Sequence, residues 1–232
     1  MKSFRTELAK PKLTLVYSLP ENKVELAEAA LAAGADAIKV HISVHHHASG
    51  THFGSLEDER GVLTDILKLA GEKCVGIVPG GGRVIQPEEI YPLKEMGFTF
   101  VSFYAHHCSP EILSIPGIEK MVAPDYTYSN FELQNWAKWG VDVIETSIID
   151  PNGYGEPLNL RDLGQYSALT QFGLPLLVPT QRKLTPTDLP SLIKAGVQGV
   201  MLGAVVTGKG PENVYKTITE FRQAIDRNED YL

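Results

Sequence analysis

The chain has 232 residues, with 21 Lys and Arg against 28 Asp and Glu, which gives a formal net charge of −7. Its 43% hydrophobic and 21% charged residues exclude a disordered or collagen-like chain. The acidic balance argues against nucleic acid and anionic membrane as partners, although a small anion can still bind locally. Because the sequence shows neither a long apolar segment nor a signal peptide, we expect a cytoplasmic protein.

Eight short apolar runs alternate with helix-like patterns along the whole chain. Strands that alternate with helices pair in parallel through βα crossovers, and eight such units favour a closed barrel over an open sheet. We therefore predict a single (β/α)8 TIM barrel domain over residues 1–232. The expected strands are Leu13–Ser18, Ala37–Ile42, Cys74–Val78, Phe98–Phe103, Lys120–Ala123, Val141–Ser147, Pro175–Val178 and Gly199–Leu202.

Between the strands, apolar residues recur at the spacing of amphipathic helices. Four glycines end such patterns shortly before the second, fourth, sixth and eighth strands, where a helix commonly ends on a residue with positive φ. This spacing reflects either ordinary turn chemistry or a repeat of two βα units. Trp136 and Trp139 are three residues apart and are predicted to pack on one helix face. The helical patterns cover residues 24–34, 57–71, 131–140, 161–173, 187–196 and 212–225, and the glycines are Gly34, Gly97, Gly140 and Gly196.

The second strand ends in two polar residues that we expect to face the barrel interior. If Ile38 and Val40 face the helices, alternation turns Lys39 and His41 inward. In β/α barrels the functional groups gather at these C-terminal strand ends. A buried lysine is costly unless it is used, and its neutral amine suits Schiff-base or proton-transfer chemistry. The alternative is a structural ion pair with an inner carboxylate.

Glu145 on the sixth strand is the natural partner for Lys39, because alternation turns it to the same side as Val141 and Val143. It serves either as a general base or as the group that neutralises the lysine. Further hydroxyl contacts near strand ends are expected from Tyr17, Ser18, Ser102 and Ser147.

The last two strands carry a family resemblance. Residues 175–208 run through Gln181-Arg182-Lys183 to a small-residue turn at Gly203-Ala204. This stretch resembles the end of the phosphate-binding TIM barrels, which include ribulose-phosphate epimerases, thiamine-phosphate synthase, tryptophan-pathway barrels and sugar-phosphate aldolases. The resemblance implies that backbone N–H groups of the loops after strands seven and eight grip a substrate phosphate. Gly203 and Ala204 match that position, whereas Arg182 stands where a glycine pair is common and is expected to contact the phosphate by its side chain.

Basic residues and glycines at the predicted strand ends favour an anionic ligand. A concave site focuses local positive charge even in an acidic protein, so we expect a basic mouth. The run Gly80-Gly81-Gly82 forms either a backbone nest for an anion, a lid or a plain turn. The basic residues in question are Lys39, Arg83, Arg182, Lys183 and Lys209.

The loop after the second strand is rich in histidine. It permits a divalent metal site, a lid that brings one histidine to the substrate as acid or base, or incidental loop residues. No known metal-ligand spacing is matched, so a divalent metal is one alternative and no cofactor is firmly predicted. The histidines are His41, His45, His46, His47 and His52, with His106 and His107 after the fourth strand.

The sequence thus predicts an enzyme for a small phosphorylated sugar or related metabolite, of the aldolase/lyase or isomerase type. Lys39, Glu145 and His41 are the expected catalytic residues. The alternatives are a metal-dependent epimerase or hydrolase that uses the histidine loop, and a non-catalytic metabolite-binding barrel. Exposed helical faces are also compatible with a homodimer, since two-fold symmetry is the commonest arrangement of oligomers.

Overall fold

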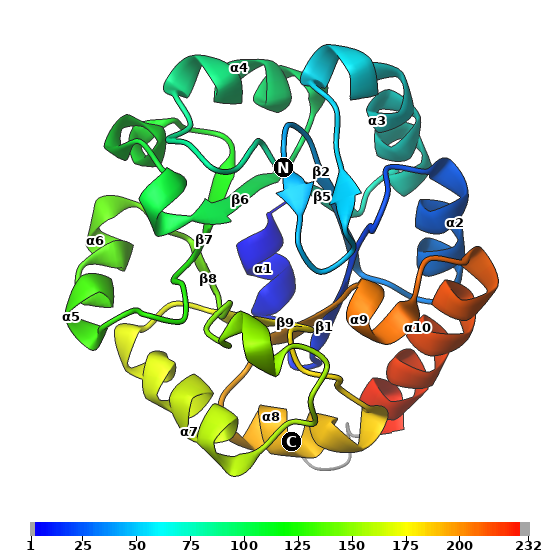
Figure 1. Ribbon diagram of the computed structural model, residues 1–232, viewed down its shortest axis with the longest axis vertical. Coiled ribbons are helices and arrows are strands. Elements are labelled where there is room, and N and C mark those ends of the chain that lie inside the picture. Colours follow the sequence, from blue (N-terminus) through cyan, green and yellow to red (C-terminus); the bar gives the residue numbers. More distant parts are fainter. Residues whose placement is uncertain (1–2, 228–232) are drawn as a thin grey trace.

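The computed structural model describes residues 3–227 and has the predicted fold. Eight parallel strands close into a barrel with helices around it (Figure 1), which confirms the (β/α)8 class and the eight expected strands. In barrel order the strands are β1 (Thr14–Ser18), β2 (Ala37–His41), β5 (Cys74–Val78), β6 (Phe100–Tyr104), β7 (Glu119–Ala123), β8 (Val143–Glu145), β9 (Leu176–Pro179) and β10 (Gly199–Leu202).

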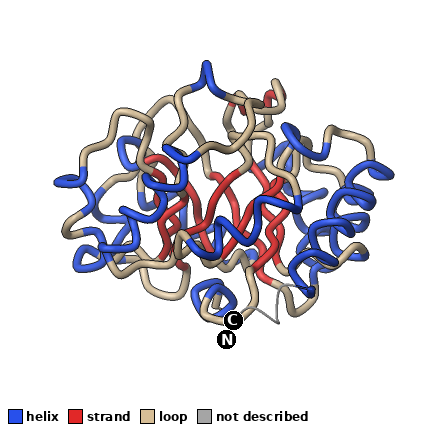
Figure 2. The backbone as a smooth tube through the Cα atoms, turned by 90° about the horizontal axis from the view of Figure 1, so that it is seen from below, coloured by secondary structure: helices blue, strands red, loops and turns tan. Residues whose placement is uncertain are grey.

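The helices form an outer layer whose apolar sides pack against the outward residues of the strands, and Figure 2 shows the strands between them from the side. Local sequence signals start several of these helices. Ser55 and Asp58, for example, form a capping box at the start of α3. The helices are α1 (Phe4–Leu8), α2 (Val24–Ala32), α3 (Leu56–Ala70), α4 (Pro87–Met96), α5 (Asn130–Leu133), α6 (Trp136–Trp139), α7 (Leu160–Leu169), α8 (Leu189–Lys194), α9 (Ala204–Thr207) and α10 (Pro211–Arg227).

The N-terminal end of the barrel is closed by α1. The carboxylate of Glu119 accepts hydrogen bonds from the backbone N–H groups of Phe4, at 2.7 Å, and Arg5, at 3.0 Å, and so holds the start of this helix. The Phe4 ring stacks on Phe100 inside the barrel, with 4.1 Å between ring centroids. A Cβ at Gly76 would lie 2.0 Å from the Phe100 ring, so only glycine leaves room for that ring.

Alternation along the strands divides the barrel interior into two levels. An apolar cluster fills the lower level, whereas on β1, β2, β6 and β8 a polar residue lies two positions further on. On β8, for example, Val143 is in the cluster and Glu145 follows it. The cluster consists of Phe4, Leu8, Val16, Ala37, Cys74, Phe100, Met121, Val143, Leu177 and Met201.

The outer layer is thin beside β6 and β7. Their connection contains only the short 3-10 helices η1 (Ala105–His107) and η2 (Pro110–Ser114). The prediction of one helix over residues 131–140 is wrong, because Asn135 leaves the helical conformation, with φ −117° and ψ 8°, and separates α5 from α6. The two tryptophans both lie on α6 and line one apolar cavity, as their spacing predicts, but only Trp136 is packed: it is buried, whereas Trp139 is 57% exposed.

The four predicted helix-ending glycines all have positive φ, between 85° and 104°. At Gly140 a Cβ would also lie 2.7 Å from the carbonyl oxygen of Leu113, so this turn requires glycine twice over. The turn chemistry is confirmed.

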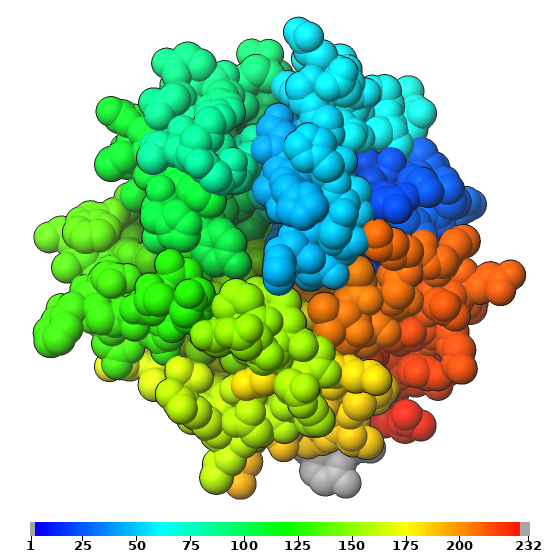
Figure 3. All heavy atoms as spheres, in the orientation of Figure 1, coloured from blue at the N-terminus to red at the C-terminus, as the bar shows by residue number. Residues whose placement is uncertain are grey.

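A small hairpin follows β2 at the C-terminal end of the barrel. Its strands are β3 (His45–His46) and β4 (Thr51–His52), and His45 lies opposite His52. Figure 3 shows this segment in light blue over the centre of the barrel, beside green and yellow-green segments. Across residues 3–227, no helix combines the length and apolar character needed to cross a membrane. Cys74 and Cys108 do not form a disulfide.

Candidate active site

A cavity of about 270 Å³ opens at the carboxyl ends of the barrel strands. Its base is formed by inward side chains of β2, β6 and β8, and its upper walls come from the loops after the strands. This is the end at which β/α barrels place their functional groups. The sequence-predicted residues Lys39, His41, Glu145, Gly203 and Ala204 all line this one cavity.

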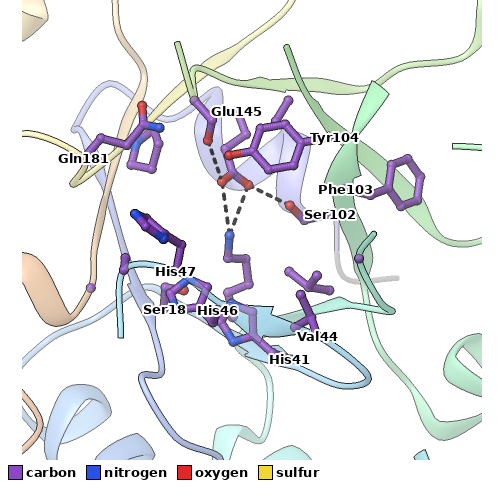
Figure 4. A pocket seen from close by; sticks show the side chains of 18 of the residues that line it. Ser18, His41, Val44, His46, His47, Ser102, Phe103, Tyr104, Glu145 and Gln181 are labelled. Atoms are coloured by element: carbon purple, nitrogen blue, oxygen red, sulfur yellow. Dashed lines mark hydrogen bonds and ion pairs between the residues drawn. The ribbon is translucent and has the colours of Figure 1, made fainter. Parts of the chain in front are cut away.

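Lys39 and Glu145 meet across the barrel at the base of the cavity. They come from the second and sixth strands of the ring, on opposite sides, and Lys39 Nζ lies 3.2 and 3.1 Å from Oε1 and Oε2 of Glu145. Ser102 Oγ donates to Oε2 at 2.6 Å, and Ser147 Oγ donates to Oε1 at 3.2 Å (Figure 4). Every oxygen of the carboxylate is therefore occupied, and its orientation is fixed.

This ion pair is enclosed, with Lys39 4% and Glu145 7% exposed. Two apolar residues of similar volume commonly stabilise a protein as well as a buried ion pair does, because removing two charges from water is costly. Stability alone therefore does not account for a lysine and a glutamate here. Buried charged groups that face a cavity are typical of catalytic sites.

His41, the predicted assisting residue, lies in the wall of the cavity. Its ring packs between His46 and Phe53, with centroid distances of 4.5 and 4.8 Å, and the side chain is 1% exposed. Its Nδ1 has no hydrogen-bond partner within the described residues. Burial, together with neighbouring His46 and Lys39, holds the pKa of His41 well below its usual value. His41 is therefore a neutral residue of the wall.

A second polar layer lies above the ion pair and was not predicted as a unit. Gln181 Nε2 donates to the Tyr154 hydroxyl at 2.6 Å, and Gln181 Oε1 accepts from Ile149 N–H at 3.1 Å. The Tyr154 ring meets His47 edge-on, with 5.6 Å between centroids. Burial raises the pKa of Tyr104 and that of Tyr154, so both phenols stay protonated and can donate hydrogen bonds at neutral pH.

The predicted phosphate turn forms another part of the same cavity. Gly203 N–H donates to Thr180 Oγ1 at 2.9 Å, so this N–H is already used. The carbonyl oxygen of Gly203 accepts from Val206 and Thr207 in the single turn of α9. The first N–H groups of a helix have no intrahelical partner, which leaves those of Ala204 and Val205 at the cavity wall as donors.

Arg182 does not reach the Gly203–Ala204 turn, so the prediction that it contacts the phosphate is wrong. Its guanidinium binds both carboxylate oxygens of buried Asp162, at 2.9 and 3.1 Å, and the carbonyl oxygen of Gly153 at 2.8 Å. Asp162 at the start of α7 takes the arginine because both are withdrawn from water and need a partner. Arg182 thus fixes the loop that contains Gly153 against α7.

The predicted basic mouth is also wrong. Arg83 pairs with Glu89 on α4, and Lys209 lies 3.5 Å from the Thr51 hydroxyl on the hairpin. Lys183 is exposed, and Lys39 is the one lysine or arginine among the described residues that line the cavity. Any anion in the cavity therefore meets one side-chain cation and otherwise neutral donors.

The histidines after β2 do not converge on one point. His46 bonds to Ser49, His47 contacts Tyr154, and His52 is exposed. Within residues 3–227, no three His, Cys, Asp or Glu side chains gather as a metal-binding group. The Gly80–Gly82 run lines the cavity and lets the hairpin approach, since a Cβ at Gly81 would lie 2.8 Å from Val44.

Three contributors to the site were missed in the sequence. Thr180 directly follows β9, two residues beyond the predicted range, so the strand-end rule could have found it. Tyr154 lies in an irregular loop where no periodicity indicates which way a side chain faces. Ser49-Gly50 is a dipeptide typical of turns, but this signal does not indicate that the turn brings the hydroxyl to His46.

Comparison with known proteins supports the fold and leaves the family open. No family model and no curated protein matches this sequence. Thiamine phosphate pyrophosphorylase from Pyrococcus furiosus is a similar solved structure, with 16% identity over 97% of this chain and 98% of that one and a TM-score of 0.66. The 3-keto-L-gulonate-6-phosphate decarboxylase from Vibrio cholerae is 12% identical over 93% and 98%, with a TM-score of 0.66. A putative fructose-1,6-biphosphate aldolase from Coccidioides immitis is 11% identical over 97% and 93%, with a TM-score of 0.68. These likenesses confirm the TIM-barrel fold.

Proposed function

We propose that the protein is an enzyme that acts on a small phosphorylated sugar or a related carbonyl metabolite, as a lyase or an isomerase. The observation that carries this proposal is the enclosed Lys39–Glu145 pair, 3.1 Å apart at the base of a cavity of small-molecule size. Structural neighbours named as a pyrophosphorylase, a decarboxylase and a putative aldolase are consistent with it. The sequence-based alternative of a metal enzyme at the histidine loop lacks a ligand cluster among the described residues.

The pair suits chemistry at a carbon next to a carbonyl. Glu145 takes a proton or assists bond cleavage at that carbon, and the electron pair released moves toward the carbonyl oxygen. Lys39 stabilises the developing negative charge in a site with little water. In a Schiff-base route, Lys39 first gives a proton to Glu145, its amine attacks the carbonyl carbon, and water leaves. Ser102 and Ser147 hold the carboxylate in place for either route.

The phosphate of the substrate is proposed to lie at the Gly203–Ala204 turn. Gly203 contributes room, because a Cβ added there would come no closer than 3.7 Å to other atoms. Ala204 and Val205 contribute backbone N–H donors, while Lys39 stays at the reacting end. A neutral set of donors is sufficient for an anion of one or two charges when the backbone is preorganised.

A thermal-shift comparison tests the binding half of the proposal. Short phosphorylated ketoses and aldoses are compared with their unphosphorylated counterparts. A ligand at about a hundred times its dissociation constant adds about 2.7 kcal/mol and should raise the melting temperature by roughly 5–10 °C. We expect shifts for phosphorylated compounds alone, and equal behaviour of both sets would contradict the phosphate site.

Ala204→Pro is a matched variant for this test. It removes the Ala204 N–H at the first position of α9, where proline is tolerated, and Gly203 already has the extended backbone that precedes proline. The variant should keep its melting temperature without ligand and lose most of the shift. NMR spectra of the same mixtures then show whether the compound changes. A stable complex with no chemical change would identify a non-catalytic binding barrel instead.

A further inference from the structure

Three histidines of the loop after β2, His45, His46 and His47, line the cavity, and one of them has a buried hydroxyl as its partner. His46 lines the cavity on the strand β3, and its Nδ1 lies 2.9 Å from the hydroxyl of Ser49, which is 8% exposed. A buried hydroxyl needs an acceptor, and Nδ1 is the acceptor that the described structure offers to Ser49. The hydroxyl then donates to Nδ1, so that the ring proton is on Nε2, the nitrogen open to a bound molecule.

The hairpin holds this ring firmly. Phe53 is 2% exposed and anchors the second strand of the hairpin, while its N–H donates to Val44 carbonyl oxygen at 2.9 Å. Gly50 N–H donates to the carbonyl oxygen of His46 at 2.8 Å and closes the turn. The His41 ring supports His46 from behind at 4.5 Å, as the two labelled rings in Figure 4 show. The imidazole is thus positioned before any substrate binds.

We propose that His46, oriented by Ser49, is a catalytic imidazole of this cavity, and that its Nε2–H donates a hydrogen bond to the substrate carbonyl oxygen. The inference rests on the proposed function. It adds His46 to Lys39 as a second group that stabilises the carbonyl oxygen, opposite Glu145. As Glu145 removes the proton from the neighbouring carbon, the C–H electron pair becomes a C=C bond and the carbonyl pair moves onto oxygen. His46 and Lys39 stabilise that oxygen, and no proton leaves His46.

The charges around His46 keep it in the required neutral form. Burial is the largest effect, the cation of Lys39 acts in the same direction, and together they lower the pKa of His46 to about 4, although Glu145 opposes them. His45 and His47 on the hairpin lower it further. A neutral ring donates from Nε2 throughout the physiological range and adds no second cation beside Lys39.

Four proteins test the proposal: the wild type, His46→Gln, Ser49→Ala and His52→Gln. His52 lies on the same hairpin, is exposed and does not line the cavity, so His52→Gln is the matched control. The readout is kcat/KM for the phosphorylated compound that the wild type converts fastest. We expect a loss on the order of 10²-fold for His46→Gln. Ser49→Ala should lose about tenfold and His52→Gln nothing.

Nitrogen NMR of isotope-labelled histidine rings provides a readout that does not depend on turnover. His46 should remain neutral with its proton on Nε2 between about pH 5 and pH 8, given a pKa of about 4. Ser49→Ala should mix the two tautomers while melting temperature stays close to that of the wild type. Protonation of His46 in that range, or a proton on Nδ1, would overturn the proposal even if the variants fail to fold.

The outcomes separate this inference from the proposed function. A wild type that converts none of the phosphorylated compounds would overturn the proposed function, and the catalytic role of His46 with it. A wild type that converts one of them, with His46→Gln equally active, would overturn the role of His46 alone. A loss confined to His46→Gln and Ser49→Ala would support both.

Discussion

The two levels of the barrel interior are built from the same strands but do different things. On β6, Phe100 belongs to the apolar cluster of the lower level, which we call the floor. Two residues later, Ser102 bonds to Glu145. On β8, Val143 precedes Glu145 by the same step. The floor is closed by α1 and contains apolar side chains, whereas the mouth encloses a lysine and a glutamate beside an open cavity. Stability and chemistry are therefore separated along the barrel axis.

Two buried lysines show that burial alone does not mark a functional residue. Lys120 on β7 is 6% exposed, much like Lys39. Its ammonium donates to the carbonyl oxygen of Ile115, on the helix side of the strand, and burial lowers its pKa. Lys39 instead faces a carboxylate in a cavity. Substitution of each lysine by methionine therefore compares a catalytic with a structural role.

The largest effect is expected for Lys39→Met. Loss of the cation at the reacting carbon should lower turnover of a phosphorylated substrate by on the order of 10³-fold or more. Lys120→Met should keep the turnover of its folded fraction within a few-fold of the wild type. Initial rates, corrected for the folded fraction by circular dichroism, check this. Equal rates for Lys39→Met and the wild type would show that the pair is structural.

The free energy of unfolding of Lys39 variants further tests whether the lysine has a catalytic or a structural role. Lys39→Met leaves Glu145 buried without its cation, which should cost about 3–5 kcal/mol in the free energy of unfolding. The double variant Lys39→Met, Glu145→Met removes both charges and should recover most of that loss while remaining inactive. Urea unfolding of the two variants measures this. A double variant less stable than the single one would mean that the pair is retained for folding.

A substitution in the floor should lower stability and leave turnover nearly unchanged. Phe100 is fully buried and stacks on Phe4, so Phe100→Ala should lower the free energy of unfolding by about 3–5 kcal/mol. The turnover of the folded fraction should change little, because the polar level above stays in place. Urea unfolding and rate measurements on one sample check both halves. A large loss of rate in the folded fraction would contradict the separation of stability and chemistry between the two levels.

Stability should also depend on pH through the buried rings of His41 and His46. The pKa of His46 is lowered from 6.5 to about 4 by burial, and that of His41 is lowered as well. Between these values the unfolded chain binds more protons than the native protein, so stability rises with pH and is lost as pH falls from about 6.5 to about 4. His46 should contribute about 3 kcal/mol to this change. Urea unfolding of the wild type and His46→Gln across that range measures it, and identical pH dependences would contradict the assignment.

A smaller effect is expected for Ser102→Ala. The variant removes one hydrogen bond, 2.6 Å long, from the carboxylate of Glu145 while Lys39 and Ser147 stay in place. Stability should fall by about 1–2 kcal/mol and the rate by about tenfold, because the carboxylate loses part of its orientation. Ser114→Ala, in η2 and away from the cavity, is the control. An effect as large as that of Lys39→Met would mean that Ser102 reacts itself.

The sequence allowed the barrel and the ion pair to be predicted because both depend on short-range periodicity. Strand alternation placed Lys39 and Glu145 inward, and glycine turn chemistry marked the helix ends. The fate of Arg182 could not be predicted, because its partner Asp162 lies 20 residues away on a helix. The break at Asn135, where a single residue leaves the helical region, was not predicted either.

Among the histidines, spacing could not tell His41 from His46. His41 ends β2 and His46 follows on β3, and only the fold of the hairpin brings the two rings together and buries the first. The pairing with Ser49 depends on the hairpin turn, which Gly50 N–H closes on the carbonyl oxygen of His46. Side-chain roles that depend on tertiary contacts of this kind are beyond what periodicity can indicate.

The most direct test of the central claim is proton exchange with solvent. The wild type, Lys39→Met and Lys120→Met are incubated in heavy water with short phosphorylated ketoses and aldoses, and NMR follows deuterium at the carbon next to the carbonyl. We predict incorporation by the wild type and Lys120→Met, and none above background by Lys39→Met. Equal incorporation by Lys39→Met, or none by a wild type that binds these compounds, would contradict the claim that Lys39 and Glu145 form the reactive centre.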